Sequence, residues 1–267
     1  MTDAPYSLAE LVIVAGAECW RNAGEVNATG ITPLPRIAAG LAKLTFSPEI
    51  AITDAECWFI DEPVPLGPRD VGDMKVEGWA PYSRTFDIVW SGKRHALVAP
   101  TMIDRFGQTN ISILGDHKKP KTAWLGARGF PGNKIHHPNS FFFPAHTTRS
   151  FISGEVDYVC SLGYNPARWP GGKKPPFLDL RLIISDLAVM DFGGPDHAIR
   201  VISLHPGVSF EQVQDNTGFP LARAASILAT PAPTAEQLKL IRERLDPNNV
   251  RKTIFKGDPP GDRRVAS

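Results

Sequence analysis

The chain has 267 residues, 42% of them hydrophobic, which is enough to form a sizeable core. Its 29 lysines and arginines nearly balance its 28 aspartates and glutamates, so the net charge of +1 provides no large field to hold nucleic acid or an anionic membrane. The sequence begins without a basic, apolar leader and contains no run of about 18 apolar residues, so we expect a cytoplasmic protein without a membrane span.

Three capping boxes predict where helices begin, because a Ser or Thr followed three residues later by Glu or Gln satisfies two otherwise free amides. The pairs are Ser7 with Glu10, Ser209 with Gln212, and Thr234 with Gln237. The last of these helices should bury Leu238, Ile241 and Leu245 and end before Pro247. A further helix is predicted over residues 34–46.

Short apolar runs predict the strands. They are EIAIT (49–53), TFDIVWSG (85–92), HALVA (95–99), SFFF (140–143), DYVCSL (157–162), RLIIS (181–185), LAVMDF (187–192) and IRVISL (199–204). Runs that are apolar on both faces are typical of a covered, largely parallel sheet. We therefore predict an α/β fold with an open, mostly parallel sheet, helices on both faces and a more antiparallel finish over residues 180–204. Residues 1–255 should form a single domain and residues 256–267 a disordered tail.

Cysteines and histidines do not indicate a metal site. The three cysteines are odd in number, far apart and without CxxC spacing, at Cys19, Cys57 and Cys160. The histidines nearest to one another are His136, His137 and His146, and they lack the spacing of a metal-binding pair. We expect reduced thiols and no structural or catalytic metal.

The segment GARGFPGNKI (126–135) is unusually rich in glycine, but it matches neither a P-loop nor a dinucleotide fingerprint. One interpretation is a tight turn at a helix end. The other is a set of backbone N–H groups presented to a thioester oxyanion or a phosphate, with Arg128 and Lys134 adding positive charge.

The segment IAITDAECWF (50–59) ends a predicted strand with two carboxylates, Asp54 and Glu56. Either carboxylate could cap the next element in solvent. Alternatively, the carboxyl ends of strands line the ligand crevice of an open α/β sheet, and burial beside Trp58 and Phe59 would suit one of them to act as a base or nucleophile. The spacing does not separate the two interpretations.

Three segments in the second half of the chain carry a family resemblance. RLIISDLAVMDF (181–192), HPGVSFEQVQDNTGFPL (205–221) and LDPNNVR (245–251) together resemble the β subunits of class I CoA-transferases of the glutaconate type. The resemblance implies a CoA-transferase (NagB/RpiA-like) fold and an obligate homologous α subunit, in an αβ or α2β2 assembly. It also implies an acyl-CoA substrate, so coenzyme A would arrive as part of the substrate, with no permanently bound cofactor.

In that family a GxGG loop followed by Asn lies beside the thioester, and the matching residues here are Gly129, Gly132 and Asn133. Pro131 interrupts the paired glycines and removes one backbone donor. The transferases also carry a nucleophilic glutamate in a Glu-x-Gly sequence, whereas Glu56 is not followed by that glycine. This departure weakens the case for covalent transfer.

Five further segments resemble one branch of the family more closely. They are EGWAPYSRTFD (77–87), IDRFGQTNIS (103–112), RGFPGNKIHH (128–137), FGGPDHAIR (192–200) and SLHPGV (203–208). Together they resemble the β subunit of the bacterial acyl-CoA hydrolases that open the last ring in steroid (cholesterol or bile acid) degradation, the IpdAB type. This implies water addition to a cyclic β-keto acyl-CoA and retro-Claisen cleavage, with the principal catalytic glutamate on the α subunit.

Within that reading, Arg128 and Lys134 would contact coenzyme A, and Trp79 and Tyr82 would line an apolar wall for a hydrocarbon ring, unless these aromatics are plain core. Two alternatives stay open. One is a CoA-transferase β subunit that works through a glutamyl-CoA at Glu56, and the other is a non-catalytic subunit that only completes its partner's site.

Overall fold

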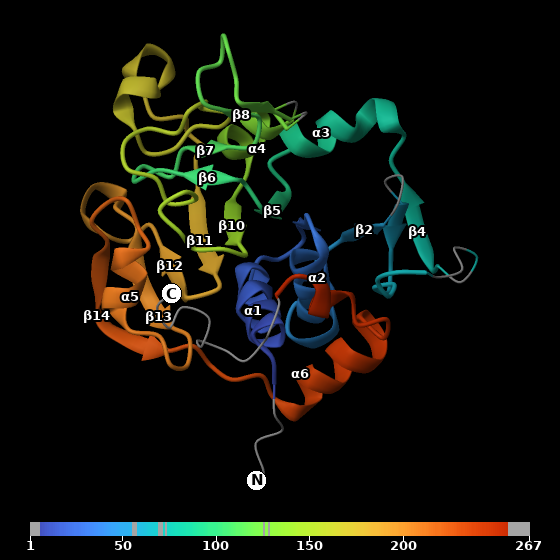
Figure 1. The fold of residues 1–267 in the computed structure, drawn as a ribbon. Coiled ribbons are helices and arrows are strands. Elements are labelled where there is room, and N and C mark those ends of the chain that lie inside the picture. The colour runs from blue at the N-terminus through green and yellow to red at the C-terminus, as the bar shows by residue number, and fades with distance from the viewer. Residues whose placement is uncertain are drawn as a thin grey trace.

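The computed structural model describes residues 6–54, 58–68, 72, 74–124, 126–127 and 129–255. Within these residues the chain builds a seven-stranded sheet (Figure 1). In spatial order its strands are β1 (Asn27–Gly30), β5 (Arg94–Val98), β10 (Asn139–Phe143), β11 (Leu180–Ser185), β12 (Ala188–Asp191), β13 (Arg200–Leu204) and β14 (Ala222–Ala229). The pairs from β1 to β11 are parallel, as is the pair of β13 with β14, whereas β12 runs antiparallel to both neighbours. The predicted mostly parallel sheet with an antiparallel finish is confirmed.

Helices lie on both faces of this sheet, as predicted. The α-helices are α1 (Leu8–Ala17), α2 (Pro33–Thr45), α3 (Thr85–Trp90), α4 (Phe130–His136), α5 (Phe210–Asp215) and α6 (Ala235–Lys239). In β10, Phe142 belongs to the hydrophobic cluster of α1 and α2, while Phe141 and Phe143 belong to the cluster that contains Val213 of α5 and Phe130 of α4. This alternation follows from the period of two residues in a strand.

The capping boxes at both ends of the chain are present. Ser7 accepts a hydrogen bond from the backbone of Glu10, and the Glu10 side chain accepts one from the backbone of Ser7. Every residue of α1 is buried. Near the carboxyl end, Thr234 and Gln237 form the same box, and α6 continues as a π-helical turn over Leu240–Leu245. Leu238, Ile241 and Leu245 are buried, as predicted for that helix.

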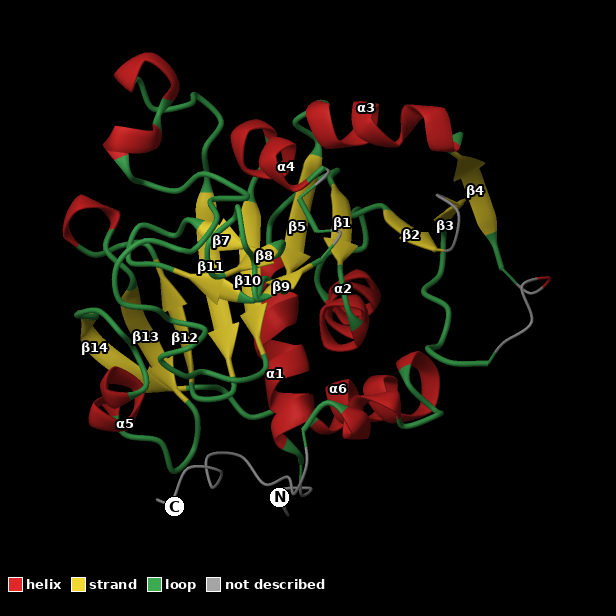
Figure 2. Cartoon of the chain, turned by 45° about the horizontal axis from the view of Figure 1, so that its top comes forward, coloured by secondary structure: helices red, strands yellow, loops and turns green. Residues whose placement is uncertain are grey.

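The segment EIAIT contains a strand, but the prediction that it joins the main sheet is wrong. Ala51 makes one isolated bridge to Asn27 of β1. The chain then forms β2 (Ile52–Asp54), which pairs antiparallel with β3 (Trp58–Ile60), and β3 pairs with β4 (Val76–Trp79). Since both pairings are antiparallel and neither of them reaches the main sheet, β2, β3 and β4 form a separate small sheet beside β1 (Figure 2).

The prediction of a strand over residues 85–92 is also wrong, because this segment forms α3. Phe86, Val89 and Trp90 stand at the i, i+3, i+4 spacing of one helix face, and this face packs against α4. A run of six residues is too short for its periodicity to distinguish a helix from a strand.

Residues 157–162 do not form the predicted strand either. Ser161 makes only an isolated bridge to Thr109, and Asp157 accepts a hydrogen bond from the backbone of Gly115 at 2.7 Å. These contacts attach residues 157–162 to the chain around Thr109 and Gly115 without forming a strand. The sequence analysis did not find β1 and β14, because NATG lacks strong strand formers and β14 is largely exposed at the edge of the sheet. It also missed four two-residue strands, which are β6 (Met102–Ile103), β7 (Thr109–Asn110), β8 (Ile113–Leu114) and β9 (Thr122–Ala123).

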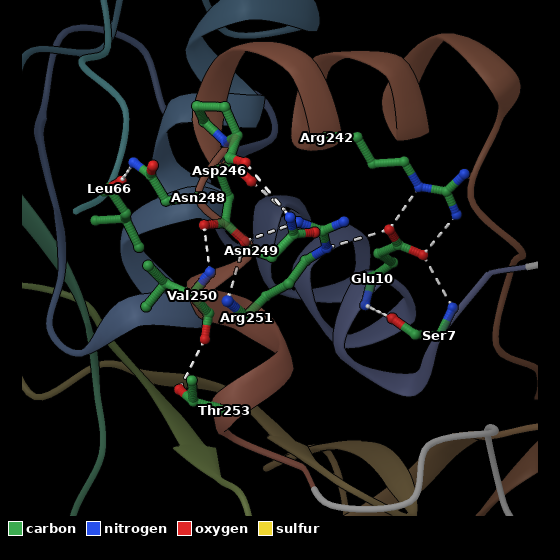
Figure 3. A network of polar contacts seen from close by, with 11 residues as sticks. Ser7, Glu10, Leu66, Arg242, Asp246, Asn248, Asn249, Val250, Arg251 and Thr253 are labelled. Atoms are coloured by element: carbon green, nitrogen blue, oxygen red, sulfur yellow. Dashed lines mark hydrogen bonds and ion pairs between the residues drawn. The ribbon is translucent and has the colours of Figure 1, made fainter. Parts of the chain in front are cut away.

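Buried charges join the two ends of the described chain (Figure 3). Glu10 accepts hydrogen bonds from Nε of Arg242 at 2.7 Å and from Nε of Arg251 at 3.2 Å. Arg251, whose side chain is 4% exposed, also donates to Asp246 at 2.8 Å. Burial raises the pKa of Glu10, but the bonds from Arg242 and from the backbone of Ser7 outweigh it and hold that pKa below its ordinary value.

Residues 256–267, for which a disordered tail is predicted, lie outside the described residues. No helix in the described ranges is long and apolar enough to cross a membrane.

Candidate functional site

The glycine-rich segment enters a helix at Phe130, so its second half is helical and Gly129 stands at the helix end. Gly129 is the N-cap of α4 with a φ of −85°, and Gly132 lies inside the helix. A methyl group added at Gly132 would lie 3.1 Å from Nε1 of Trp90, and one added at Gly129 would lie 3.0 Å from Phe86. Glycine at these two positions therefore lets α4 pack closely against α3.

Asn133 is buried and held by an arginine that the sequence analysis did not identify. Nη1 of Arg94, at the start of β5, donates to Oδ1 of Asn133 at 2.9 Å, and Nε of Arg94 donates to the hydroxyl of Thr29 at 2.9 Å. The carbonyl of Asn133 accepts from the side chain of Asn139 at 3.0 Å. Arg94 therefore ties α4 to β1 and β5 and fixes the orientation of the Asn133 amide.

Lys134 does not present its charge to the surface of this chain, contrary to the expectation that it flanks an anion site. It is fully buried, its Nζ donates to the carbonyl of Gly107 at 2.5 Å, and Nζ lies 4.6 Å from the centre of the Phe141 ring. Burial lowers its pKa well below the ordinary value, although Asp104 opposes this. Lys134 is buried because it lies one helical turn after Phe130 and shares with it the buried face of α4.

Three of the segments that carry the resemblance meet at this point. Lys134 belongs to RGFPGNKIHH, and its partner Gly107 belongs to IDRFGQTNIS. Gly107 has a φ of +75°, and a methyl group there would lie 2.6 Å from Phe192, the first residue of FGGPDHAIR. Segments far apart in the sequence thus form one packed unit beneath α4.

Asp54 is buried and paired with Arg36 of α2, whose side chain is 31% exposed. Arg36 and Thr29 also line a cavity of about 60 Å³ between α2 and the small sheet. The carboxylate of Asp54 is therefore held by a cation rather than capping an element in solvent. Glu56, Cys57 and Arg128 lie outside the described residues.

Trp79 and Tyr82 are not core residues, because they are 54% and 78% exposed. The rings of Trp58 and Trp79 lie 5.9 Å apart across β3 and β4. Tyr82 leads into α3, where the rings of Phe86 and Trp90 stack at 5.6 Å. We call Trp79, Tyr82, Phe86 and Trp90 the aromatic surface. It runs along α3 from the small sheet to α4, so α3 brings the predicted aromatics and the predicted glycines together (Figure 2).

The histidines have separate roles. The rings of His136 and His137 bond to the carbonyls of Gly132 and Pro138, and the ring of His146 bonds to the hydroxyls of Ser185 and Thr217. In the described part of the chain, no group of three or more His, Cys, Asp or Glu side chains is arranged to hold a metal ion. Cys19 and Cys160 are free and buried, and burial raises the pKa of Cys19 to about 12.

No protein-family model matches the chain. The chain is 42% identical over 243 residues to the cholesterol ring-cleaving hydrolase IpdB subunit of Rhodococcus jostii strain RHA1, a match that covers 91% of this chain and 94% of the relative. It is 32% identical over 254 residues to one of the subunits of the 3-oxoadipate CoA-transferase of Pseudomonas knackmussii, covering 89% of this chain and 92% of the relative.

The crystal structure of Rhodococcus jostii RHA1 IpdAB is similar over 95% of this chain and 100% of the matched chain, with a TM-score of 0.87 and 40% identity. The resemblance predicted from the sequence and the CoA-transferase fold are therefore confirmed. The chain belongs to the family of the cholesterol ring-cleaving hydrolase IpdB subunits, which shares its fold with subunits of the CoA-transferases.

Proposed function

We propose that this chain is the β subunit of a heteromeric hydrolase that opens a cyclic β-keto acyl-CoA in late steroid ring degradation, of cholesterol or bile acids. The observation that carries the proposal is the 42% identity to an IpdB subunit across 91% of the chain. The packed unit formed by Lys134, Gly107 and Phe192 supports it, because it joins three of the segments on which the resemblance rests.

The reaction needs a base and a place for developing negative charge. Water adds to the ring carbonyl as a base takes its proton, and the adjacent carbon–carbon bond then breaks. The electron pair moves onto the carbon next to the thioester, whose oxygen carries the enolate charge until that carbon is protonated. These steps require no resident metal or cofactor, and coenzyme A enters and leaves as part of the substrate.

The described residues favour a supporting role for this chain in the chemistry. Asp54 is buried in an ion pair with Arg36, so it does not supply a free base. We place the principal catalytic glutamate on a homologous α subunit. Gly129, Gly132 and Asn133 of this chain contribute the wall on the thioester side, through α4 and its contact with α3.

The aromatic surface supports a partner-dependent enzyme. Large exposed aromatic side chains grouped along neighbouring elements, here β4, the turn at Tyr82 and α3, indicate a surface that another molecule covers. Within the aromatic surface, Trp79, Tyr82 and Trp90 are more exposed than Phe86. We propose that they are enclosed on binding of the α subunit and that they then form an apolar wall for the ring. A cytoplasmic location fits the free thiols of Cys19 and Cys160.

The alternative is a CoA-transferase β subunit that uses Glu56 as nucleophile. The identity to a subunit of a 3-oxoadipate CoA-transferase favours this alternative. The sequence Glu56-Cys57 lacks the glycine of the transferases, so we expect no glutamyl-CoA there. A subunit without chemistry of its own is the third possibility.

One experiment separates these functions. The chain is purified alone and together with its α subunit, and each sample is assayed with a cyclic β-keto acyl-CoA in the presence and absence of a carboxylic acid acceptor. We expect turnover only in the complex and without an acceptor. Acceptor-dependent turnover, together with a borohydride- or hydroxylamine-trapped Glu56 in mass spectrometry, would identify a transferase instead.

A further inference from the structure

The loop NPARWPGGKKPP (165–176) carries two exposed lysines on a well-held backbone. Asn165 caps the turn η4 (Pro166–Arg168) by accepting from the backbone of Ala167 at 3.1 Å. The indole of Trp169 donates to the carbonyl of Gly163 at 2.9 Å. Lys173 and Lys174 are therefore presented on a backbone that is already ordered, which lowers the entropic cost of binding a ligand.

Lys174 and His197 converge on one buried ring. Nζ of Lys174 lies 5.3 Å from the centre of the Tyr164 ring, and the His197 ring stacks on Tyr164 at 4.0 Å and 13°. Tyr164 is 7% exposed, and its hydroxyl accepts from the backbone of Leu180 at 3.1 Å. His197 comes from the turn η6 (Pro195–His197) in FGGPDHAIR, so this motif supplies one wall of the cluster.

Lys173 and Lys174 differ in their pairing from Arg168, the third cation of this loop. Among the described residues, no ion pair joins Lys173 or Lys174 to a carboxylate, whereas Arg168 is paired with Glu155. Asp196 is exposed beside His197 and is the one carboxylate on that turn. Phe177 follows the lysines and is 64% exposed. Two cations beside an exposed aromatic ring match the phosphates and the base of a nucleotide.

This cluster is connected to the candidate functional site. Phe192 contacts the Tyr164 ring at 5.7 Å and lies against Gly107, whose carbonyl accepts from Lys134 of α4. In Figure 1, the turns around residues 166–172 (yellow, upper left) and the helices α4 and α3 lie on the same side of the molecule. The loop with the lysines and the candidate functional site therefore share one side of the molecule.

We propose that Lys173, Lys174 and His197 bind the phosphates of the 3′-phospho-ADP end of coenzyme A, with Phe177 against the adenine. The acyl thioester then reaches α4 and the aromatic surface. This inference rests on the proposed function, because it takes an acyl-CoA as the substrate. It assigns the nucleotide end to the β subunit.

The test compares two Lys-Lys-Pro sequences in the complex of this chain with its α subunit. The double variant Lys173→Ala/Lys174→Ala is matched with Lys118→Ala/Lys119→Ala, which removes two exposed lysines from another loop. Calorimetry measures the Kd of coenzyme A, of dephospho-CoA, which lacks the 3′-phosphate, and of inorganic phosphate. We expect the first variant to weaken coenzyme A binding about 5- to 30-fold. Its preference for coenzyme A over dephospho-CoA should disappear, and KM should rise while kcat stays.

Unchanged coenzyme A binding in the first variant, or an equal loss in the control, would overturn the assignment. So would a loss confined to inorganic phosphate, which would show a simple anion site. Phe177→Ser gives a second measurement without a change of charge and should weaken both coenzyme A forms. If the wild-type complex turns over acyl-CoA while both variants bind normally, only this subsite is wrong. If the wild-type complex binds no coenzyme A, the proposed function fails with it.

Discussion

Arg251 and Glu10 form a buried ion pair between residues 241 positions apart. The same guanidinium also donates to Asp246, so one arginine compensates two buried carboxylates. Arg242, whose side chain is 40% exposed, is a second cation on Glu10. The amino-terminal helix is thus fixed to the carboxyl end of the described chain by charge as well as by apolar packing.

Arg251→Ala should destabilise the chain by about 3–5 kcal/mol, because it removes the cation from buried Asp246 and leaves Glu10 paired with Arg242 alone. Arg223→Ala is the control. Arg223 pairs with Glu211 where both side chains are more than half exposed, and its loss should change stability by less than about 1 kcal/mol. Urea unfolding measures both variants. Equal effects would show that the Glu10 contacts contribute no more than a surface pair.

Stability should fall in mild acid, partly because of His205. Burial lowers the pKa of His205 from 6.5 to about 4, and its neutral ring bonds to Thr230 and to the carbonyl of Ser185. The unfolded chain therefore takes up the proton first as pH falls, so stability is full above pH 6.5 and is lost between about pH 6.5 and 4. The loss attributable to this group is about 3 kcal/mol at pH 4. Thermal unfolding against pH should be flatter in His205→Gln, and an unchanged slope would assign the acid sensitivity to other groups.

Two glycines of the same segment should respond differently to alanine. A methyl group at Gly126 would lie 2.2 Å from the carbonyl oxygen of Ile111, so Gly126→Ala should destabilise by about 2 kcal/mol or more. A methyl group at Gly132 meets Trp90, which is 55% exposed and can move, and alanine favours the helix, so Gly132→Ala should keep stability within about 1 kcal/mol. Displacing the Trp90 ring alters the contact between α3 and α4 and the aromatic surface, so turnover of the complex should fall by about 10- to 100-fold. Wild-type turnover in Gly132→Ala would show that the glycine serves only the packing of this chain.

Arg94 and Asn133 should act as a unit. Arg94→Ala, Asn133→Ala and the double variant form a cycle, with turnover of the complex as the measurement. We expect a coupling of about 1–3 kcal/mol, because Arg94 fixes the Asn133 amide through a bond of 2.9 Å. Thr29→Val removes a hydrogen bond of Arg94 that does not involve Asn133 and should have a smaller effect. Additive losses would mean that Arg94 does not act through Asn133.

The aromatic surface should matter for assembly and little for folding. Tyr82→Ser changes a side chain that is 78% exposed, so the stability of the isolated chain should change by less than about 0.5 kcal/mol. Because we propose that the α subunit covers Tyr82, the affinity of the Tyr82→Ser chain for the α subunit should fall about tenfold or more. Leu228→Ser on β14, 64% exposed, is the control. Pull-down titration against the α subunit distinguishes the two, and equal affinities would place the interface elsewhere.

The sequence predicted the elements whose signals are local. The run around Phe141–Phe143 and the capping boxes at Ser7 and Thr234 depend on neighbours in the chain, and the structure has them. The segment that forms α3 contains apolar residues compatible with both periods, and its helix is selected by the space that Gly129 and Gly132 leave for it. That choice is tertiary and cannot be predicted from six residues.

The site was harder to predict than the fold, because its residues are defined by partners distant in the sequence. Lys134 follows Gly-Asn and has the pattern of a surface cation, yet in the core it donates a hydrogen bond to a carbonyl 27 positions away. Arg94 has no signal before an apolar strand, and its importance comes from Asn133, 39 positions later. The resemblance found the right segments without the contacts among them.

The Glu10 contacts also bear on how the protein is made. A ribosome releases Glu10 long before Arg242 and Arg251, so α1 emerges with a carboxylate whose partners do not yet exist. The hydrophobic cluster around α1 also includes Ile241, Leu245 and Phe255, which are synthesised late. This half of the molecule therefore closes only after nearly the whole described chain has been synthesised. A product terminated before Arg242 would expose α1 to the quality-control machinery of the cell.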